Sequence, residues 1–554
     1  MLELSADLSN SPLWRATLAE RSGDEAPGQR ERLRAAFVRF RANAADLATE
    51  IRRDLPYLTV HDVTHLDGLW DIASIVVGEA YPMTPTEGFV LGGAILLHDL
   101  AMSIAATEGG YEAIMADPRW ADLVTSQYRS DFARDPLPAE VRNPDPSIRD
   151  RSLFDILRQI HAENAEKLAF VSYCSTDGTP LFLIDDPEIR YAFGAMMGQI
   201  AHSHWWSLTE VETRFSRTIG PPSWCPRAWT VDPLKIACIL RSADAAHLDA
   251  RRAPQFLKAI ISLPSSSEVH WRFQEKLSKP YLRQDSLVFT SSSPFKVQES
   301  AAWWLCLETL RMVDEELRGV DALFADKGCP RFAAHHVAGV DHPERLSSYV
   351  RTDGWLPINA VVHVTDLPDV IKSLGGEALY GPQPRVALRE LIQNACDAVR
   401  ARRVLENRAS TFGTVTITLD KLADEDWLQV KDNGIGMSRR VLTDFLLNFG
   451  KSFWSSSQVQ EEFPGLLASR FRSVGRYGIG FFAVFMIADH VQIVTRRSDS
   501  AAADTLVLEF SSGLTARGKS RSRQFEPEET REIGWFLTGR RGENRSSETF
   551  TTGC

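Results

Sequence analysis

The chain has 554 residues, of which 62 are Lys or Arg and 73 are Asp or Glu, so its net charge is −11 at pH 7. A hydrophobic share of 44% and a charged share of 24% are ordinary for globular proteins and exclude a disordered or collagen-like chain. The length predicts about three or four domain-sized units, and the acidic balance gives no long-range attraction to nucleic acid or to an anionic membrane.

The seven cysteines are scattered and form no Cys-x-x-Cys pair. This pattern is unfavourable for a disulfide framework or a cysteine-based zinc site and favours a reducing, cytoplasmic location. The start of the chain carries Glu3 and Asp7, where an export signal would carry positive charge. The longest apolar runs, 88–97 and 478–488, have about half of the ~20 residues that a membrane helix needs, so we expect no membrane contact.

Helical periodicity dominates the amino-terminal half. Leu33, Phe37, Phe40, Leu47 and Ile51 recur at helical spacing, and helical pattern continues to about residue 250, apart from a Pro- and Asp-rich loop at 135–150. We therefore expect an extension at 1–30 and an all-α domain at 31–255. A helical and irregular extension with a connector, including a helix at 298–318, should fill 256–358.

From residue 359 the pattern becomes α+β. We expect helices at 385–403 and 438–447, and strands at 360–364, 414–419, 427–430, 490–495 and 504–510. These elements predict a layer of helices on a sheet over 359–512. The segment 513–554 is polar, Arg-rich and without periodicity, so we expect a largely disordered tail.

The first of four chemically suggestive segments in this half is RELIQNACDAV (389–399). On a helix, Glu390, Asn394 and Asp397 share one face. A carboxylate and an amide one turn apart could hold a water molecule and a hydrated magnesium ion, because magnesium prefers oxygen ligands and keeps several waters. The alternative is an ordinary solvated helix face.

The second segment, VKDNGIGM (430–437), places Asp432 at the end of a strand, followed by Gly434 and Gly436. A carboxylate there could accept a hydrogen bond from an exocyclic amine, while the glycines let a flat base approach the backbone. The alternative is a tight turn after a strand, for which Asp-Asn-Gly is well suited.

The third and fourth segments carry a lysine and a run of glycines. NFGKSFW (448–454) contains Lys451 but lacks the glycine spacing of a Walker loop. In VGRYGIGFFAVF (474–485), Gly475, Gly478 and Gly480 open an apolar helix, and backbone amides at a helix start can cradle phosphates. Either signal is weak on its own.

Together, in this order, the four segments resemble the GHKL ATPases, which include gyrase, heat shock protein 90, histidine kinases and the mismatch-repair protein MutL. The nucleotide-binding domain of heat shock protein 90 chaperones is the closest resemblance, over about residues 365–510. It implies a Bergerat fold, with helices on a mixed sheet, that binds ATP and Mg²⁺. Glu390 would be the general base, Asn394 the magnesium ligand, and Asp432 the acceptor of the adenine amine beside Gly436.

The resemblance also implies a wider set of nucleotide contacts. The cofactor-binding residues would be Asn394, Asp397, Asp432, Gly434, Gly436, Lys451, Gly475, Gly478 and Gly480. The chain departs from the chaperones after the last expected strand, because only about 45 residues follow and no middle or dimerisation domain is visible. We therefore expect slow ATP turnover.

Histidines and aspartates recur in the helical half. They lie in HDVTHLDGLW (61–70), LLHDLAM (96–102), RQIHAENA (158–165), QIAHSHWW (199–206) and LRSADAAHLD (240–249). A His-Asp doublet that ends an apolar helix, with further His and Asp residues elsewhere, can gather around a divalent metal. Scattered histidines are usually structural, but five segments in order favour a metal site.

This pattern resembles the HD superfamily of metal-dependent phosphohydrolases, over about residues 30–255. The resemblance makes His65, His98, Asp99 and Asp244 the core ligands. His161 and His204 would serve a second ion, with His202 as a competitor of His204. Imidazole and carboxylate ligands suit Mn²⁺, Fe²⁺, Ni²⁺ or Zn²⁺.

The sequence thus predicts a multidomain protein in which an all-α HD-type domain precedes an α+β ATP-binding domain. The leading hypothesis is slow Mg-dependent ATP hydrolysis coupled to an HD-type phosphohydrolase-like domain acting on a nucleotide or nucleic-acid phosphate, in a bacterial defence or stress system. One alternative is an ATP-gated, chaperone-like binding module whose HD domain is non-catalytic and holds a protein client or partner. A structural pseudo-enzyme is another, and an oligomer is compatible with all three.

Overall fold

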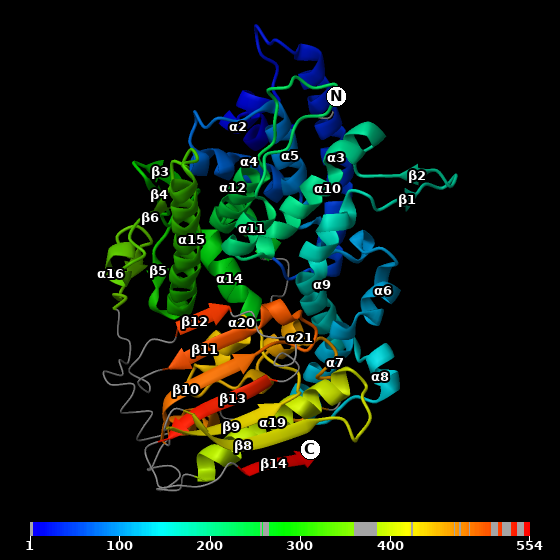
Figure 1. Ribbon diagram of the computed structural model, residues 1–554. Helices are drawn as coiled ribbons and strands as arrows, with labels where there is room; N and C mark the ends of the chain where they lie inside the picture. Colours follow the sequence, from blue (N-terminus) through cyan, green and yellow to red (C-terminus); the bar gives the residue numbers. More distant parts are fainter. Residues whose placement is uncertain are drawn as a thin grey trace. The chain divides into compact units, whose positions relative to one another are not determined.

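The structure is a computed structural model that describes residues 4–254, 257–258, 265–358, 385–422, 425–469, 471–475, 478–486, 488–510, 519–522, 533–539 and 548–553. The chain divides into two compact units (Figure 1). The first unit combines residues 1–116 with 150–360, and the second combines residues 117–149 with 361–554. Each unit is therefore built from two separate stretches of sequence.

The first unit is predominantly helical, as the sequence predicts. Its helices are α1 (Ala6–Ser9), α2 (Pro12–Thr17), α3 (Pro27–Asp54), α4 (Val63–Val77), α5 (Pro85–Leu97), α6 (Gly110–Ala116), most of α9 (Pro146–Leu168), α10 (Pro187–His202), α11 (Leu208–Arg214), α12 (Pro233–Ala246), α14 (Ser265–Lys276), α15 (Ser300–Lys327) and α16 (Pro343–Leu346). Its short strands are β1 (Tyr173–Cys174), β2 (Pro180–Leu181), β3 (Tyr281–Arg283), β4 (Ser286–Val288), β5 (Phe295–Lys296), β6 (His336–Val337) and β7 (Thr352–Asp353).

Helix α5 is the central element of the first unit, and every one of its residues is buried. Thr84 and Glu87 form a reciprocal capping box at its start, which satisfies two otherwise unpaired backbone groups. Gly92 lets the helix approach its neighbours closely, since a Cβ there would lie 2.5 Å from the Phe37 ring. Among the described residues, no helix is long and apolar enough to cross a membrane.

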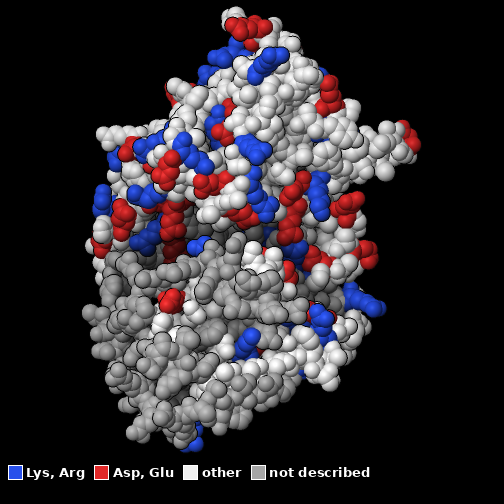
Figure 2. Space-filling view, viewed as in Figure 1, with Lys and Arg blue, Asp and Glu red and all other residues white. Residues whose placement is uncertain are grey.

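Charged side chains on the visible face of the first unit show no single-sign patch. Figure 2 shows basic and acidic residues interspersed over this face.

The second unit combines helices with a seven-stranded sheet. Its helices are α7 (Pro118–Phe132), α8 (Pro138–Arg142), α19 (Arg385–Leu405), α20 (Arg439–Val441) and α21 (Gln458–Glu462). Its strands are β8 (Thr414–Leu422), β9 (Glu425–Asp432), β10 (Ala488–Thr495), β11 (Leu506–Phe510), β12 (Lys519–Ser522), β13 (Ile533–Gly539) and β14 (Glu548–Gly553). Their order in the sheet is β12-β11-β10-β13-β9-β8-β14.

All described strand pairs of this sheet are antiparallel, whereas the resemblance implies a mixed sheet. The strand expected at 360–364 lies outside the described residues. Helix α19 matches the helix expected at 385–403, and Leu391, Ala395 and Val399 on its buried face belong to one apolar core with sheet residues such as Val430 and Val491.

The prediction of a disordered tail at 513–554 does not hold for β12, β13 and β14. Strand β13 pairs with β9 on one side and β10 on the other, so the tail contributes an interior strand to the sheet. The sequence Ile-Gly-Trp-Phe-Leu-Thr-Gly of β13 is rich in residues that favour strands. Its polar, Arg-rich flanks obscured this short signal, and its pairing partners lie far away in sequence.

Two local elements differ from the sequence prediction. The helix expected at 438–447 is a short α-helical turn, α20, that continues as a π-helix over Leu442–Leu446. The helix expected after the glycine run is a 3₁₀ helix, Gly480–Met486. Both elements line the cavity described below, and irregular helices of this kind occur often at functional sites.

Candidate functional sites

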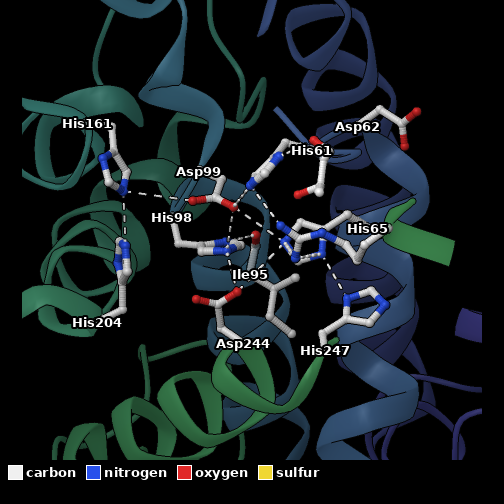
Figure 3. A network of polar contacts seen from close by, with 12 residues as sticks. His61, Asp62, His65, Ile95, His98, Asp99, His161, His204, Asp244 and His247 are labelled. Carbon is white, nitrogen blue, oxygen red and sulfur yellow. Dashed lines mark hydrogen bonds and ion pairs between the residues drawn. The ribbon is translucent and has the colours of Figure 1, made fainter. Parts of the chain in front are cut away.

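The six ligands expected for the HD-type metal site converge in the first unit (Figure 3). His65 lies on α4 and Asp244 on α12, while His98 and Asp99 end α5. The other two are His161 on α9 and His204 in the 3₁₀ turn after α10. All but Asp244 and His204 are buried. Five segments separated by up to 180 residues therefore bring nitrogen and oxygen ligands to one place.

Four of these side chains form a first group around the carboxylate oxygens of Asp99 and Asp244. His65 Nε2 lies 3.3 Å from Asp99 Oδ2 and 3.8 Å from Asp244 Oδ1. His98 Nε2 lies 3.2 Å and 3.6 Å from the same two oxygens. One potential ligand atom from each residue lies within 4.8 Å of all the others, which is compact enough for one ion.

Asp99 also belongs to a second group. Its other oxygen, Oδ1, lies 3.8 Å from His161 Nε2, and His161 Nε2 lies 3.1 Å from His204 Nε2. The two oxygens of one carboxylate therefore face two different groups of ligands. Asp99 could therefore contribute an oxygen ligand to each group.

Backbone carbonyls orient three of the imidazole rings. The Nδ1 atoms of His98, His161 and His204 lie at hydrogen-bond distance from the carbonyls of Ile95, Arg158 and Ala201, the residues three positions earlier in each case. Because a carbonyl only accepts, each Nδ1 must donate its proton. The lone pair of Nε2 then faces the cluster, which is the tautomer that a metal ligand requires.

The electrostatics of the first group fit a cation. Burial opposes the charged form of His98, but the negative charges of Asp99 and Asp244 outweigh it and raise the pKa of His98 to about 10. Burial, with the charge of Arg252, lowers the pKa of His65 to about 3. Without metal, a proton on His98 therefore balances the carboxylates, and a divalent cation would replace that proton.

The position of His98 Nε2 supports this fit. This buried atom lies 3.2 Å from Asp99 Oδ2 and 3.6 Å from Asp244 Oδ1 but makes no hydrogen bond of good geometry to either. Buried polar atoms are normally hydrogen-bonded, and a cation held by these ligands would satisfy the nitrogen. The side chains present suit a divalent transition metal such as manganese, iron, nickel or zinc.

Sequence reasoning left three neighbouring residues unassigned or unnoticed. His247 Nδ1 lies 2.8 Å from His65 Nδ1, so the two rings are in hydrogen-bond contact. His61 and Arg252 border the same ring. The Ala-His-Leu-Asp-Ala-Arg-Arg stretch at 246–252, shortly after Asp244, was the available signal. His202, the competitor of His204, instead pairs with Glu166 at 2.6 Å.

The second unit contains a cavity of about 410 Å³. Eight of the ten residues predicted for ATP chemistry line it, namely Glu390, Asn394, Asp432, Gly436, Lys451, Gly475, Gly478 and Gly480. Residues that the sequence analysis did not single out also line it, among them Arg389, Met437, Trp454 and Thr495. The cavity is large enough for much of a nucleotide and combines apolar walls with a few polar groups, as ligand sites usually do.

Asp432 is a buried carboxylate at the cavity wall. It is 4% exposed, and its Oδ1 accepts a hydrogen bond of 2.8 Å from Gly434 N–H. Burial raises the pKa of Asp432 to about 7, because the hydrogen bond and the charge of Arg402 only partly offset the loss of water. Its second oxygen remains available for a donor such as an exocyclic amine.

The glycines near Glu390 and Asn394 provide space for a ligand. A Cβ at Gly480 would lie 2.4 Å from Glu390 Oε2, and one at Gly475 would lie 3.5 Å from Asn394 Oδ1. Gly478 has a φ of +64° and packs on the backbone of Lys451. A larger side chain at these positions would fill the space between the α19 side chains and the glycine-containing loop.

Two predicted cofactor residues do not line the cavity. Asp397 is fully buried and accepts hydrogen bonds from the N–H groups of Val474 and Gly475, at 2.9 Å each, while pairing with Arg400. It therefore holds the start of the glycine-containing loop. Gly434 allows a tight turn, since a Cβ would lie 2.5 Å from the Ala398 backbone. Both residues support the site from behind its wall.

Comparison with known proteins matches both halves of the chain. Residues 55–319 match the family model HD-CE, and residues 382–533 match a model described as Histidine kinase-, DNA gyrase B-, and HSP90-like ATPase. The chain joins an HD-CE domain to an HSP90-like ATPase domain. Both resemblances drawn from the sequence are thereby confirmed, and the ATPase match supports ATP binding.

Several individual relatives match the ATPase region. Chaperone protein HtpG of Mycobacterium tuberculosis is 37% identical over 120 residues, which cover 21% of this chain and 18% of that protein. The HtpG protein of Nitrobacter winogradskyi is 36% identical over 128 residues, which cover 21% of this chain and 19% of that protein. The HtpG protein of a Sulfurovum species is 31% identical over 140 residues, which cover 24% of this chain and 22% of that protein. The chain thus spans about a fifth of the length of the curated relatives it matches.

Proposed function

We propose that the protein binds ATP with Mg²⁺, hydrolyses it slowly, and couples this cycle to a metal-dependent phosphohydrolase-like site in its HD-CE domain. The observation that carries the proposal is the convergence of His65, His98, Asp99, His161, His204 and Asp244 on two adjoining groups of ligand atoms. The ATP part is supported by the family match and by the cavity that contains Glu390, Asn394 and Asp432.

In the ATPase domain, each polar residue of the cavity has a distinct task. Asp432 accepts a hydrogen bond from the adenine amine, and the backbone around Gly475–Gly480 holds the phosphates. Asn394 would hold the magnesium ion, which neutralises phosphate charge when bound. Glu390 takes a proton from the attacking water, and its ion pair with Arg389, at 2.8 Å, orients its carboxylate.

In the HD-CE domain, the protein residues hold and orient the reaction site. His65, His98, Asp99 and Asp244 would bind one cation, and Asp99, His161 and His204 a second. Bound divalent cations supply Lewis acidity and ease the loss of a proton from water. The backbone carbonyls behind the histidines keep each ring in the tautomer that presents Nε2. The substrate class is a phosphoester of a nucleotide or nucleic acid.

A crossed pair of variants tests the proposal in the full chain. Glu390→Ala should keep ATP binding and lose about 10²–10⁴-fold in hydrolysis rate, with metal content unchanged. His98→Ala combined with Asp99→Ala should lose the bound metal and keep ATP binding. Elemental analysis after manganese or iron supplementation, calorimetry with ATP and phosphate release give the three readouts. Metal below one equivalent in the folded parent protein would contradict the HD part alone.

The biological setting that we infer is a cytoplasmic bacterial defence or stress system, in which one domain senses and the other acts. The six described cysteines are all free thiols, which suits a reducing compartment. ATP-dependent binding of an unfolded protein client, with no phosphohydrolase activity in the metal-loaded protein, would instead favour the chaperone-like module.

A further inference from the structure

Arg252 is a buried arginine whose guanidinium group lies beside the histidines of the first metal group. It is 8% exposed and ends the 3₁₀ turn Ala250–Arg252. Its Nη2 lies 2.7 Å from His61 Nε2, and its Nη1 lies 2.9 Å from His65 Nδ1. Its Nε has no hydrogen-bond partner. In the part of the chain that the structure describes, no carboxylate forms an ion pair with it.

This environment is unfavourable for an arginine without a ligand. A guanidinium group keeps its charge at all ordinary pH values, and a buried charge is costly unless a counter-charge pairs with it. The groups that touch Arg252 are the imidazole rings of His61 and His65. The nearby carboxylates of Asp99, Asp244, Asp249 and Asp62 act on it only through space.

Metal binding makes the excess of positive charge larger. One divalent cation together with Arg252 already exceeds the two negative charges of Asp99 and Asp244, and a second cation adds to the difference. Of the other carboxylates near Arg252, Asp249 is paired with Arg251 and Asp62 caps α4. A buried site of this kind favours an anionic ligand. The planar fork of N–H donors on Arg252 suits a phosphate oxygen pair in particular.

We propose that Arg252 forms a phosphate-binding subsite of the HD-CE metal centre, in which its guanidinium group binds a substrate oxyanion next to the ions. The proposal rests on the proposed metal site and adds to it the residue that recognises the substrate anion. Arg251 provides a matched control, because it is the adjacent arginine but pairs with Asp249 at 2.6 Å and Asp71 at 3.2 Å.

The test uses the full chain loaded with manganese and inorganic phosphate as the probe. Manganese broadens the ³¹P resonance of phosphate that binds close to it, so a titration gives the affinity at this site. Arg252→Gln should keep the metal and weaken phosphate binding about tenfold or more. Arg252→Lys, which keeps the charge, should retain part of the affinity, and Arg251→Gln should match the parent protein.

Two outcomes separate the possible failures. A folded, metal-loaded Arg252→Gln protein that binds phosphate with the affinity of the parent overturns the subsite. If the parent protein holds no metal, the proposed function fails. In that case, calorimetry measures phosphate binding to the metal-free parent protein and to the metal-free Arg252→Gln protein. Equal phosphate affinities of the two proteins overturn the subsite.

A second, independent observation concerns α7 and the wall of the ATP cavity. Residues 117–149 lie within the stretch of sequence that matches HD-CE, but they belong to the same compact unit as the ATPase sequence. Asp122 on α7 is fully buried and accepts hydrogen bonds of 2.6 Å from the N–H groups of both Gly465 and Ala468. It thus caps the turn 465–468, which we call the lid turn.

The lid turn is connected to the cavity through aromatic side chains. Phe471, three residues after the turn, packs on Trp454 with ring centroids 5.0 Å apart, and Trp454 lines the cavity. Val474 and Gly475, which follow a few residues later, also line the cavity. A second contact from α7, Arg129 Nη2 to the carbonyl of Leu467 at 3.4 Å, holds the same turn.

We infer that Asp122 is a positioning residue for the ATP site, through which the α7 segment sets the conformation of the lid turn. An Asp→Asn change removes one of the two acceptor oxygens and presents an amide donor to a backbone N–H. Asp131→Asn on the exposed face of α7 is the matched control.

Hydrogen exchange and steady-state kinetics test this inference in the full chain. Asp122→Asn should speed exchange of the amides at 465–468 without nucleotide and raise the KM for ATP about tenfold, with a smaller change in kcat. Asp131→Asn should leave both unchanged. A folded Asp122→Asn protein with the parent's exchange at the lid turn and the parent's KM overturns the inference.

Discussion

Replacement of Asp432 by asparagine should weaken ATP binding in a pH-dependent way. Asp432 Oδ1 already accepts the N–H of Gly434, so the other oxygen is the one that can accept the adenine amine. In the variant, an amide N–H group would occupy that position and face another donor. The loss of this hydrogen bond should cost about 1–3 kcal/mol, or about 5- to 150-fold in Kd at pH 8.

The sign of the pH effect follows from the raised pKa. Only the ionised carboxylate accepts with both oxygens, one from Gly434 N–H and the other from the adenine amine. Burial raises the pKa of Asp432 to about 7. The ionised fraction therefore rises about tenfold from pH 6 to pH 8. The affinity of the parent protein relative to the variant should rise by the same factor, because the titration of ATP itself affects both proteins equally.

Isothermal calorimetry with MgATP at pH 6, 7 and 8 measures both proteins. Asp444→Asn is the control, since Asp444 is exposed and does not line the cavity. Equal affinities of parent and Asp432→Asn at pH 8 would refute the assignment of Asp432. A ratio that does not change with pH would refute the role given to its raised pKa.

Three further substitutions test the packing around the two sites. Gly68→Ala should lower metal affinity about 10- to 100-fold. The added Cβ would lie 2.7 Å from His247 Cε1 and would displace His247 from its contact with His65. Metal titration measures the affinity. Gly480→Ala should reduce ATP hydrolysis more than ATP binding. The added Cβ would lie 2.4 Å from Glu390 Oε2, so the carboxylate would have to move. Phosphate release measures hydrolysis, and calorimetry measures binding. Asp397→Asn should lower the free energy of unfolding by about 1–3 kcal/mol and weaken nucleotide binding. The reason is that the buried carboxylate accepts hydrogen bonds from the N–H groups of Val474 and Gly475. Urea unfolding measures the loss of stability.

A neutral glycine substitution controls for the two glycine variants. Gly28 has no heavy atom within 4 Å of its ideal Cβ position and no positive φ, so Gly28→Ala should change neither metal nor ATP binding. If Gly68→Ala binds metal as the parent protein does, His247 does not position His65. If Asp397→Asn unfolds like the parent protein, the carboxylate contributes nothing to the loop.

The sequence by itself determined which candidate residues share one face or one end of a helix. Glu390 and Asn394 are one helical turn apart, so a single helix fixes their common face, and α19 presents both to the cavity. The His98-Asp99 doublet is likewise local, since it ends the apolar helix α5. Short-range spacing is sufficient in such cases, because the backbone geometry of one element dictates which side chains meet.

Only the tertiary structure decided which residues from distant parts of the sequence contact the candidate site residues. His247 and Arg252 reach His65 across more than 180 residues, and Asp122 reaches the lid turn across more than 340. Strand β13 is placed inside the sheet by pairing with β9 and β10, although its flanks are polar. Periodicity within a segment carries no information about such contacts, because they depend on how buried faces of separate elements pack. The same packing determines which histidine of the 199–206 segment, His204 or His202, faces the metal ligands.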